Sequence, residues 1–210
     1  RTYVQRIFSE IAPRYDLLNR LLSLGIDKRW RTLALKRLGW DRAPKGTYLD
    51  LCAGTLDVGA ELSRKPGFGG CIFAADFAEP MLRAGVGKAS AQVLSPVVAD
   101  ALALPVKDGA FDGAIVAFGI RNVTHIDRAL AEAYRVLKPG GRFLCLEFSE
   151  CQVPLLDRLY DFHSFEVIPR LGKLTAGAAE PYQYLVESIR KFPKQEPFAS
   201  LIRAAGFERV

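Results

Sequence analysis

Carboxylic acids stand at or near the ends of three short apolar stretches, and their spacing favours a ligand site. Asp50 lies within the first stretch, Asp76 follows the second and Asp100 follows the third. The stretches predict strands over residues 48–52, 71–75 and 97–99. Because an open parallel sheet binds its ligands outside the carboxyl ends of its strands, we expect these acids to share one rim.

The segment after the first stretch has the composition of a ligand-binding loop. Small residues that include Gly54 and Thr55 follow Asp50, and a helix is predicted directly after them. Small side chains let a ligand approach the backbone, whose N–H groups can hold polar atoms. The loop lacks the G-x-G-x-x-G pattern of dinucleotide sites, and its carboxylate would repel a pyrophosphate. It therefore favours a ligand with a positive charge or several hydroxyl groups.

The other two acids have a spacing typical of a nucleoside site. Asp76 lies about 20 residues beyond Gly54, where a carboxylate can accept hydrogen bonds from both hydroxyls of a ribose. Asp76 could instead cap the helix predicted from Glu79, since Asp is a favoured N-cap residue. Asp100 could accept a hydrogen bond from an exocyclic amine, with the N–H of Ala101 donating to a ring nitrogen. Taken together, the acids favour a nucleoside ligand.

Alternating strands and helices must position these residues. Further strands are predicted over residues 113–118 and 142–148, and helices over 57–63, 79–88 and 126–137. A K-P-G-G sequence at 138–141 stops the last of these helices. Other helices are predicted over 7–22, interrupted by a proline, over 28–38 and throughout 153–205. The pattern predicts an α/β fold with a Rossmann-like, doubly wound and mostly parallel sheet.

The composition is that of one soluble globular domain. The chain has 210 residues, 50% hydrophobic and 25% charged, and no apolar run of the ~20 residues that a spanning helix needs. Four cysteines (Cys52, Cys71, Cys145, Cys151) lack paired C-x-x-C spacing and there are two histidines, so we expect reduced thiols, no metal site and a cytoplasmic protein.

The positive charge is concentrated at one end of the chain. Residues 1–45 hold eleven Lys and Arg against four Asp and Glu, a balance of +7 in a chain whose net charge is +6. Such a segment could meet nucleic acid, an anionic membrane surface or water alone. On composition alone, a basic face in contact with water is favoured among the three.

Several motifs make the chain resemble class I S-adenosylmethionine-dependent methyltransferases, and among them the ubiquinone/menaquinone biosynthesis C-methyltransferases. Phe111-Asp112 before the fourth strand and the R-V-L-K-P-G-G-R of residues 135–142 are similar to the superfamily. The closer resemblance is carried by FSEIAPRYDLLNRLLSLGIDKRW (8–30), FGIRNV (118–123), LEFS (146–149), YDFHSFEVIPRLG (160–172) and YLVESIR (184–190).

The resemblance implies methylation of a ring carbon of a polyprenylated quinol, either demethylmenaquinol or a 2-methoxy-6-polyprenyl-1,4-benzoquinol. It implies S-adenosylmethionine as donor, S-adenosylhomocysteine as product and no metal. By this resemblance Gly54 and Thr55 lie in the cofactor loop, Asp76 holds the ribose, Asp100 and Ala101 hold the adenine, and Asp50 lies near the methionine ammonium. The chain departs from the family at Leu56, where glycine is frequent, at His163, where tyrosine is common, and in lacking the two last strands.

The resemblance also divides the chain into three parts of one compact domain. Residues 1–45 are expected to form a basic helical lid, 46–150 the cofactor-binding α/β core, and 151–210 a helical segment that binds the substrate. Aromatic residues between 160 and 192 would line the substrate pocket, although aromatics at helical spacing usually form core.

Three residues are candidates for the chemistry. Arg121, just past the fourth strand, is expected to stabilise the ionised quinol hydroxyl. Asn122 could orient the substrate or cap a turn. His163 could be a base, although a lone histidine in an aromatic helix is more often packed and hydrogen-bonded.

Two other functions are compatible with the sequence. One is a module that binds S-adenosylmethionine without catalysis, and the other is a methyltransferase of another small molecule or of nucleic acid. The fourth strand runs into F-G-I-R rather than the Asn/Asp-Pro-Pro-aromatic motif of enzymes that methylate amino groups of bases, so we expect no nucleic-acid partner. We expect peripheral contact with an anionic membrane, at the inner face of the cell membrane. A five-stranded sheet would leave an uncovered edge that favours association, and the sequence leaves open whether the protein is a homodimer.

Overall fold

The computed structural model describes residues 2–12, 15–23, 25–149 and 180–210. It forms two compact units, one comprising residues 1–147 and 201–210 and the other residues 148–200. In the described part of the second unit, Phe192 and Phe198 pack with their ring centroids 4.9 Å apart. The predicted division at residues 45 and 150 stays a prediction.

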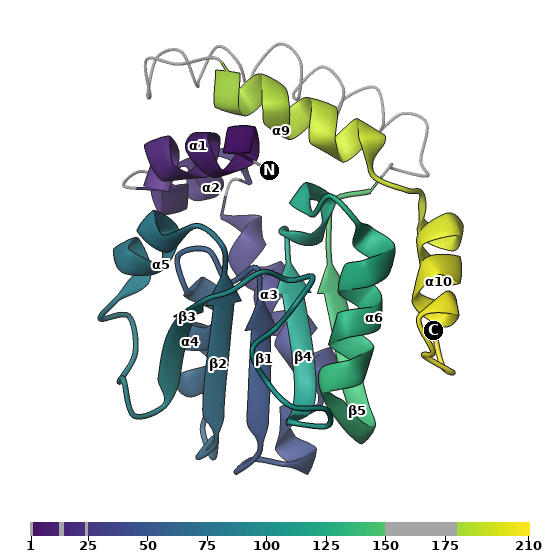
Figure 1. Ribbon diagram of the computed structural model, residues 1–210. Helices are drawn as coiled ribbons and strands as arrows, with labels where there is room; N and C mark the ends of the chain where they lie inside the picture. Colours follow the sequence, from purple (N-terminus) through teal and green to yellow (C-terminus); the bar gives the residue numbers. More distant parts are fainter. Residues whose placement is uncertain (1, 13–14, 24, 150–179) are drawn as a thin grey trace. The chain divides into compact units, whose positions relative to one another are not determined.

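The first unit is built on a five-stranded parallel sheet with the order β3-β2-β1-β4-β5 (Figure 1). The strands are β1 (Thr47–Leu51), β2 (Cys71–Asp76), β3 (Leu94–Val98), β4 (Phe111–Ala117) and β5 (Leu137–Leu146). In register, Asp50 lies between Ala74 of β2 and Ile115 of β4. The predicted doubly wound α/β fold is confirmed, and the strand order changes direction next to β1.

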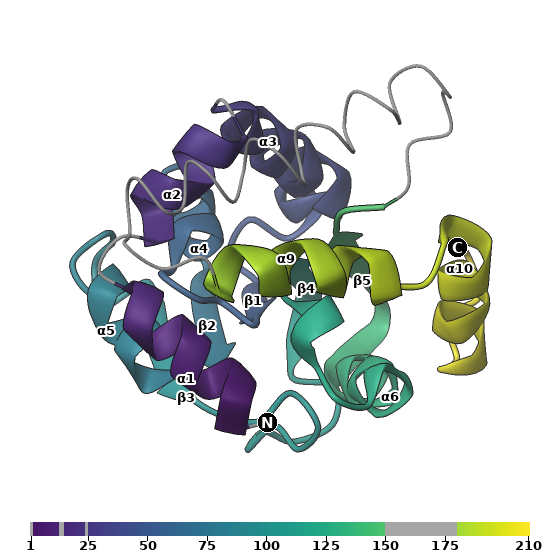
Figure 2. The same cartoon turned by 90° about the horizontal axis from the view of Figure 1, so that it is seen from above.

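Helices cover both faces of this sheet, which explains why its central strands are apolar on both sides. Along the whole chain, the described helices are α1 (Thr2–Ile11), α2 (Tyr15–Leu22), α3 (Ile26–Leu38), α4 (Asp57–Ser63), α5 (Glu79–Gly85), α6 (Ile126–Val136), α9 (Glu180–Lys191) and α10 (Gln195–Ala204), with 3₁₀ turns η2 (Trp40–Arg42) and η3 (Ile120–Asn122). Of these, α9 and most of α10 belong to the second unit. Figures 1 and 2 show α3 and α4 on one face and α6 on the other. Leu35 of α3, Leu49 of β1 and Leu130 of α6 are fully buried.

Two strands differ from their predicted bounds for identifiable reasons. β3 begins at Leu94, three residues earlier than expected, and contains Pro96. Among the described strands β3 is an edge of the sheet, where a proline is tolerated because its missing N–H is not needed. β5 begins at Leu137, directly after α6. Its pairing with β4 shifts register between Phe111 and Gly113 of β4, and this shift accommodates the glycines near the start of β5.

Within the described residues there is no helix long and apolar enough to cross a membrane. The same residues contain no group of three or more His, Cys, Asp and Glu side chains that could hold a metal ion. Cys52, Cys71 and Cys145 are free thiols. Cys151 lies outside the described residues.

The end of α5 packs against the backbone of the loop after β1, and only glycine fits there. A Cβ on Gly85 would lie 2.3 Å from the carbonyl oxygen of Thr55. We therefore expect Gly85→Ala to lower the free energy of unfolding by about 1–3 kcal/mol, because the loop or the helix must shift. Chemical denaturation measures the change. Ala84→Ser, at an exposed position of the same helix, is the control and should change stability little. Equal stability of the two variants would contradict this packing.

Candidate functional site

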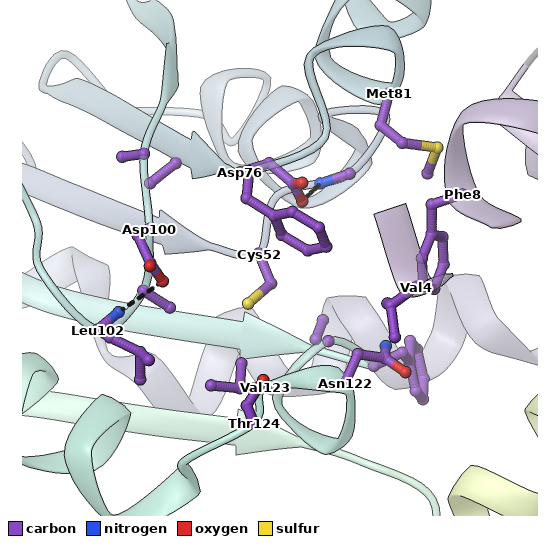
Figure 3. Close-up of a pocket in the computed structure, with 18 of the residues that line it drawn as sticks. Val4, Phe8, Cys52, Asp76, Met81, Asp100, Leu102, Asn122, Val123 and Thr124 are labelled. Atoms are coloured by element: carbon purple, nitrogen blue, oxygen red, sulfur yellow. Dashed lines mark hydrogen bonds between the residues drawn. The ribbon is translucent and has the colours of Figure 1, made fainter. Parts of the chain in front are cut away.

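A cavity with about 820 Å³ of empty space, open to solvent, lies at the carboxyl ends of the first four strands (Figure 3). The strand ends contribute Cys52, Gly54, Asp76, Phe77, Asp100, Ala101, Leu102, Phe118 and Gly119 to its wall. Val4 and Phe8 of α1, Tyr15 of α2 and Met81 of α5 form an apolar side, and Asn122, Val123 and Thr124 close it after η3.

Asp76, the last residue of β2, connects two loops at this rim. Its Oδ2 accepts a hydrogen bond from the N–H of Gly54 and its Oδ1 accepts one from the N–H of Ala78, both at 2.8 Å. Burial raises the pKa of Asp76, and the backbone N–H donors only partly offset that effect. The predicted cap of the following helix is thus present through Ala78, while the same carboxylate also faces the cavity.

Asp100 lies across the cavity from Asp76, in a tight turn that follows β3 (Figure 3). Its Oδ1 accepts a hydrogen bond from the N–H of Leu102 at 3.1 Å, and the N–H of Ala103 donates to its carbonyl oxygen. The turn holds Ala101 in the cavity wall. The sequence-predicted pair of Asp100 and Ala101 is therefore brought to the same pocket as Asp76.

These residues fit a nucleoside. A carboxylate offers about four lone-pair positions, so Asp76 can accept from hydroxyl groups in addition to its two backbone donors. Asp76 and Asp100 face one pocket from neighbouring strand ends, and the intervening wall is apolar enough to contact a base. Gly54, whose φ of +51° suits glycine, brings the backbone of the loop into the wall.

Asp50 is not in the cavity wall. It is 2% exposed, and its Oδ2 accepts a hydrogen bond from the N–H of Gly59 at 2.9 Å, beneath the first turn of α4. Burial raises its pKa to about 7, and the neighbouring carboxylates of Asp76 and Asp57 add to the shift. In this structure Asp50 supports the loop from behind, and its expected contact with a ligand ammonium stays a prediction.

The loop after β1 contains backbone conformations that side chains rarely adopt. Cys52 has φ +56° and Leu56 has φ +67°, while across the rim Phe118 has φ +59°. Leu56 thus takes a left-handed conformation that glycine would adopt without strain, and its side chain is 2% exposed in the core. Leu56 does not line the cavity, so this departure from the family pattern leaves the described opening free.

Helix α2, which precedes the sheet, is tied to this loop by partly buried polar contacts. Thr55 Oγ1 donates to Asp16 Oδ1 of α2 at 2.5 Å, and Thr55 is 3% exposed. Lys88 Nζ donates both to Asp16 Oδ2 and to Asp57 Oδ1, the latter at 2.7 Å. The hydroxyl of Thr55 therefore binds the N-terminal segment and does not face the cavity.

Arg121 has a specific acidic partner. Its Nη1 lies 2.7 Å from Glu147 Oε1, both side chains are 4% exposed, and the same nitrogen donates to the carbonyl oxygen of Phe118. Its backbone N–H points to Glu147 Oε2 at 3.4 Å. The guanidinium is thus held beside the rim and is not in the cavity wall, so its assignment as a catalytic group stays a prediction.

The residues that directly follow Arg121 line the cavity. The amide of Asn122 lies at the cavity wall opposite Met81, and the Asn122 backbone N–H donates to the carbonyl oxygen of Gly119 (Figure 3). Both alternatives for Asn122, substrate contact and turn cap, are compatible with this position. His163 lies outside the described residues.

Sequence reasoning missed two site features. Glu147 follows β5 just as other acids follow their strands, and that shared position was the signal that could have identified it. Cys52 lines the cavity, but burial and then the nearby carboxylates raise its pKa, so it stays a neutral thiol and a poor nucleophile.

Comparison with known proteins gives one consistent result. All 210 residues match the ubiE/COQ5 methyltransferase family. A curated relative from Brucella abortus (strain S19), the ubiquinone/menaquinone biosynthesis C-methyltransferase UbiE, is 48% identical over 99% of this chain and 78% of its own length. Its counterpart from Brucella anthropi is 47% identical over 99% of this chain and 80% of its own length.

Solved structures share the fold. A SAM-dependent methyltransferase from Thermotoga maritima superposes with a TM-score of 0.68 at 23% identity, covering 98% of this chain and 82% of that one. The [4+2]-cyclase SpnF gives a TM-score of 0.70 at 19% identity, over 97% and 72%. At this level of identity the likeness is one of fold alone.

The raised pKa of Asp50 predicts a specific dependence of stability on pH. Between about pH 4 and pH 7 the folded chain holds a proton on Asp50 that the unfolded chain has lost, so this group makes stability fall as pH rises. Asp50→Asn removes that effect while its amide oxygen can still accept from Gly59. We expect its free energy of unfolding, relative to the unaltered chain, to rise between pH 4 and pH 8 by an amount on the order of 1–3 kcal/mol.

Asp112→Asn is the matched control, because the pKa of Asp112 is shifted in the opposite direction and its effect on stability should change with pH in the opposite sense. Partial burial raises the pKa of Asp112, but hydrogen bonds from Lys138 and from the N–H of Thr47 outweigh burial and leave that pKa lowered. Asp112→Asn should therefore cost more stability at pH 8 than at pH 3. Denaturant titrations at several pH values measure both variants, and parallel curves for the two would show that Asp50 ionises normally.

Proposed function

This chain belongs to the ubiE/COQ5 methyltransferase family, and we propose that it transfers a methyl group from S-adenosylmethionine to a ring carbon of a polyprenylated quinol. The main structural support for this proposal is a single cavity that has a polar side and an apolar side. Asp76 and Asp100 form a polar side suited to a nucleoside, while Val4, Phe8 and Met81 form an apolar side.

S-adenosylmethionine supplies an electrophilic methyl group, with S-adenosylhomocysteine as the product. In our proposal Asp76 accepts hydrogen bonds from the ribose hydroxyls and Asp100 accepts one from the adenine amine. The backbone N–H of Ala101 donates to the adenine ring. The hydrogen bonds from Gly54 and Ala78 support these roles, because they hold the Asp76 carboxylate in place before any ligand arrives.

Positioning contributes more to such a reaction than proton removal. If the quinol hydroxyl has a pKa near that of tyrosine, ionising it at pH 7 costs roughly 4 kcal/mol. Aligning a ring carbon with the methyl group contributes about 7–11 kcal/mol. We therefore assign the main work to the apolar wall and to Asn122, which orient the ring and exclude water.

We propose that Arg121 stabilises the ionised hydroxyl electrostatically. Glu147 and the carbonyl oxygen of Phe118 fix the guanidinium at the end of β4, next to the turn that carries Asn122. Because Glu147 balances part of the charge, the contribution of Arg121 is moderate. His163 as the group that accepts the proton remains a prediction from the sequence.

The remaining partners are also proposals. We propose peripheral contact with an anionic membrane, where a polyprenylated quinol resides, and we propose no nucleic-acid substrate. Homodimerisation remains a prediction that analytical ultracentrifugation of the purified protein would test.

Calorimetry with S-adenosylmethionine tests the nucleoside side of the cavity. Asp76→Ala and Asp100→Ala should each weaken binding by about 10- to 100-fold, because each removes an acceptor that bears a charge. The control is Asp41→Ala, at an exposed acid outside the cavity wall. Methyl transfer to a short-chain quinol, followed by mass spectrometry, completes the test. Unchanged affinity in Asp76→Ala, or binding without methylation of any quinol, would contradict the proposal.

Arg121→Met tests the electrostatic role. We expect the methylation rate to fall by about 10- to 100-fold at pH 7 and to recover partly at higher pH, since more of the hydroxyl then ionises without help. Affinity for S-adenosylmethionine should not change.

The single substitution leaves the carboxylate of Glu147 buried without its partner, which destabilises the fold. Arg121→Met combined with Glu147→Gln restores neutrality, so this double variant should fold normally yet remain slow. Arg128→Met, at an exposed position of α6, is the control for loss of a positive charge. A double variant as fast as the control would exclude Arg121 from the chemistry.

A further inference from the structure

Helix α3 carries apolar residues on two sides, one buried and one partly exposed. Ala34, Leu35 and Leu38 are buried against the sheet, as expected for a helix that covers one of its faces. Ile26, Trp30 and Leu33 recur at the i, i+4, i+7 spacing of a second side and are 43%, 38% and 51% exposed. A helix that only covered the sheet would have polar residues at Ile26 and Leu33, so the exposure of these two side chains of the outer stripe needs another explanation.

Positive charges flank the stripe. Arg29, Lys36 and Arg37 are exposed on or beside the same side of α3, and Lys28 is exposed in its first turn. The single carboxylate of the helix, Asp27, is 4% exposed and lies 2.9 Å from Arg31, which is itself buried. The charge balance of the outer side of α3 is therefore entirely positive.

The stripe adjoins the wall of the cavity. The rings of Trp30 and Phe118 lie with their centroids 6.3 Å apart. Phe118 lines the cavity directly after β4. Through this ring contact, Trp30 connects α3 to the wall of the cavity in which we place the quinol ring.

We propose that Ile26, Trp30 and Leu33 of α3 are the surface with which this protein docks on an anionic lipid bilayer. This inference rests on the proposed function, because docking there would bring a membrane-bound quinol to the wall beside Phe118. An apolar stripe bordered by Lys and Arg suits the boundary between headgroups and acyl chains. Trp has an apolar ring and a polar N–H, and is favoured at that depth.

The same observations argue against two other occupants. A second copy of the chain would bring the cations of two α3 helices together, and within α3 no exposed carboxylate would balance them. A nucleic acid would use the cations but would gain little from three exposed apolar side chains. The bilayer is the partner that uses both features at once.

Vesicle sedimentation tests the proposal with the whole chain. We expect strong partition to vesicles of 30% phosphatidylglycerol in phosphatidylcholine and weak partition to pure phosphatidylcholine. Ile26→Ser with Leu33→Ser should reduce partition to the anionic vesicles by about tenfold, because apolar area is lost. Arg29→Gln with Lys36→Gln should reduce it by a similar factor and should also weaken its dependence on salt.

Matched controls change the same kinds of side chain elsewhere. Val86→Ser with Val210→Ser removes exposed apolar groups, and Lys107→Gln with Arg128→Gln removes exposed charges. Neither control should alter partition by more than about twofold. Partition of the α3 variants equal to that of their controls would overturn the proposal. So would a change in sedimentation from dimer to monomer in Ile26→Ser/Leu33→Ser, because the stripe would then be an interface between copies.

Methylation of a water-soluble short-chain quinol separates this proposal from the proposed function. All α3 variants should methylate it at the rate of the unaltered protein, because none of the substituted residues lines the cavity. If no form of the protein methylates any quinol, the proposed function fails irrespective of vesicle binding. If methylation proceeds and the unaltered protein does not prefer anionic vesicles, only the docking surface is wrong.

Discussion

Buried carboxylates bound to backbone N–H groups organise the rim on which this site depends. Asp76 joins the loop after β1 to the start of α5, and Asp50 holds the first turn of α4. Removing a carboxylate from water is costly, and the raised pKa values of both groups indicate that their hydrogen bonds do not recover the whole cost. In return, these hydrogen bonds hold the loop after β1 and the first turns of α4 and α5 in place. The pocket is therefore shaped before a ligand binds.

The position of the rim could be predicted from the sequence, because it depends only on the strands being parallel. Parallel strands end at one edge, so acids at the ends of apolar stretches must gather there. Which acids face the cavity could not be predicted in the same way. Asp50 lies one residue before the end of β1, where strand alternation turns its side chain beneath α4, whereas Asp76 and Asp100 stand at or beyond the ends of their strands. A difference of one or two positions separates a side chain that lines the cavity from one buried behind it, and strand ends are the least certain part of a sequence-based prediction.

Contacts between distant segments account for the rest of what the sequence left open. The partner of Arg121 lies 26 residues away, directly after β5, and the partner of Thr55 lies 39 residues away on α2. The positively charged residues of 1–45 likewise divide into buried and exposed ones, and composition cannot show which are which. Arg31 points inward, beside Asp27, because it shares a side of α3 with Leu35, while Arg29 and Lys36 point outward. Helical periodicity shows which residues of α3 share a side. It separates the buried cation from the exposed ones only once the buried side of the helix is known.

The two sides of the cavity are built from parts of the chain with different constraints. The nucleoside side uses the ends of β1, β2 and β3, whose acids and loops are joined by hydrogen bonds within a short stretch of sequence. The opposite side combines α1, α2, the end of β4 and η3, which meet only in the folded protein. Changes in the second group leave the contacts of Asp76 and Asp100 intact, so the acceptor can vary while the donor stays the same. A shared fold therefore identifies the nucleoside side more securely than the reaction, and the acceptor must be argued from the residues around Phe118 and Asn122.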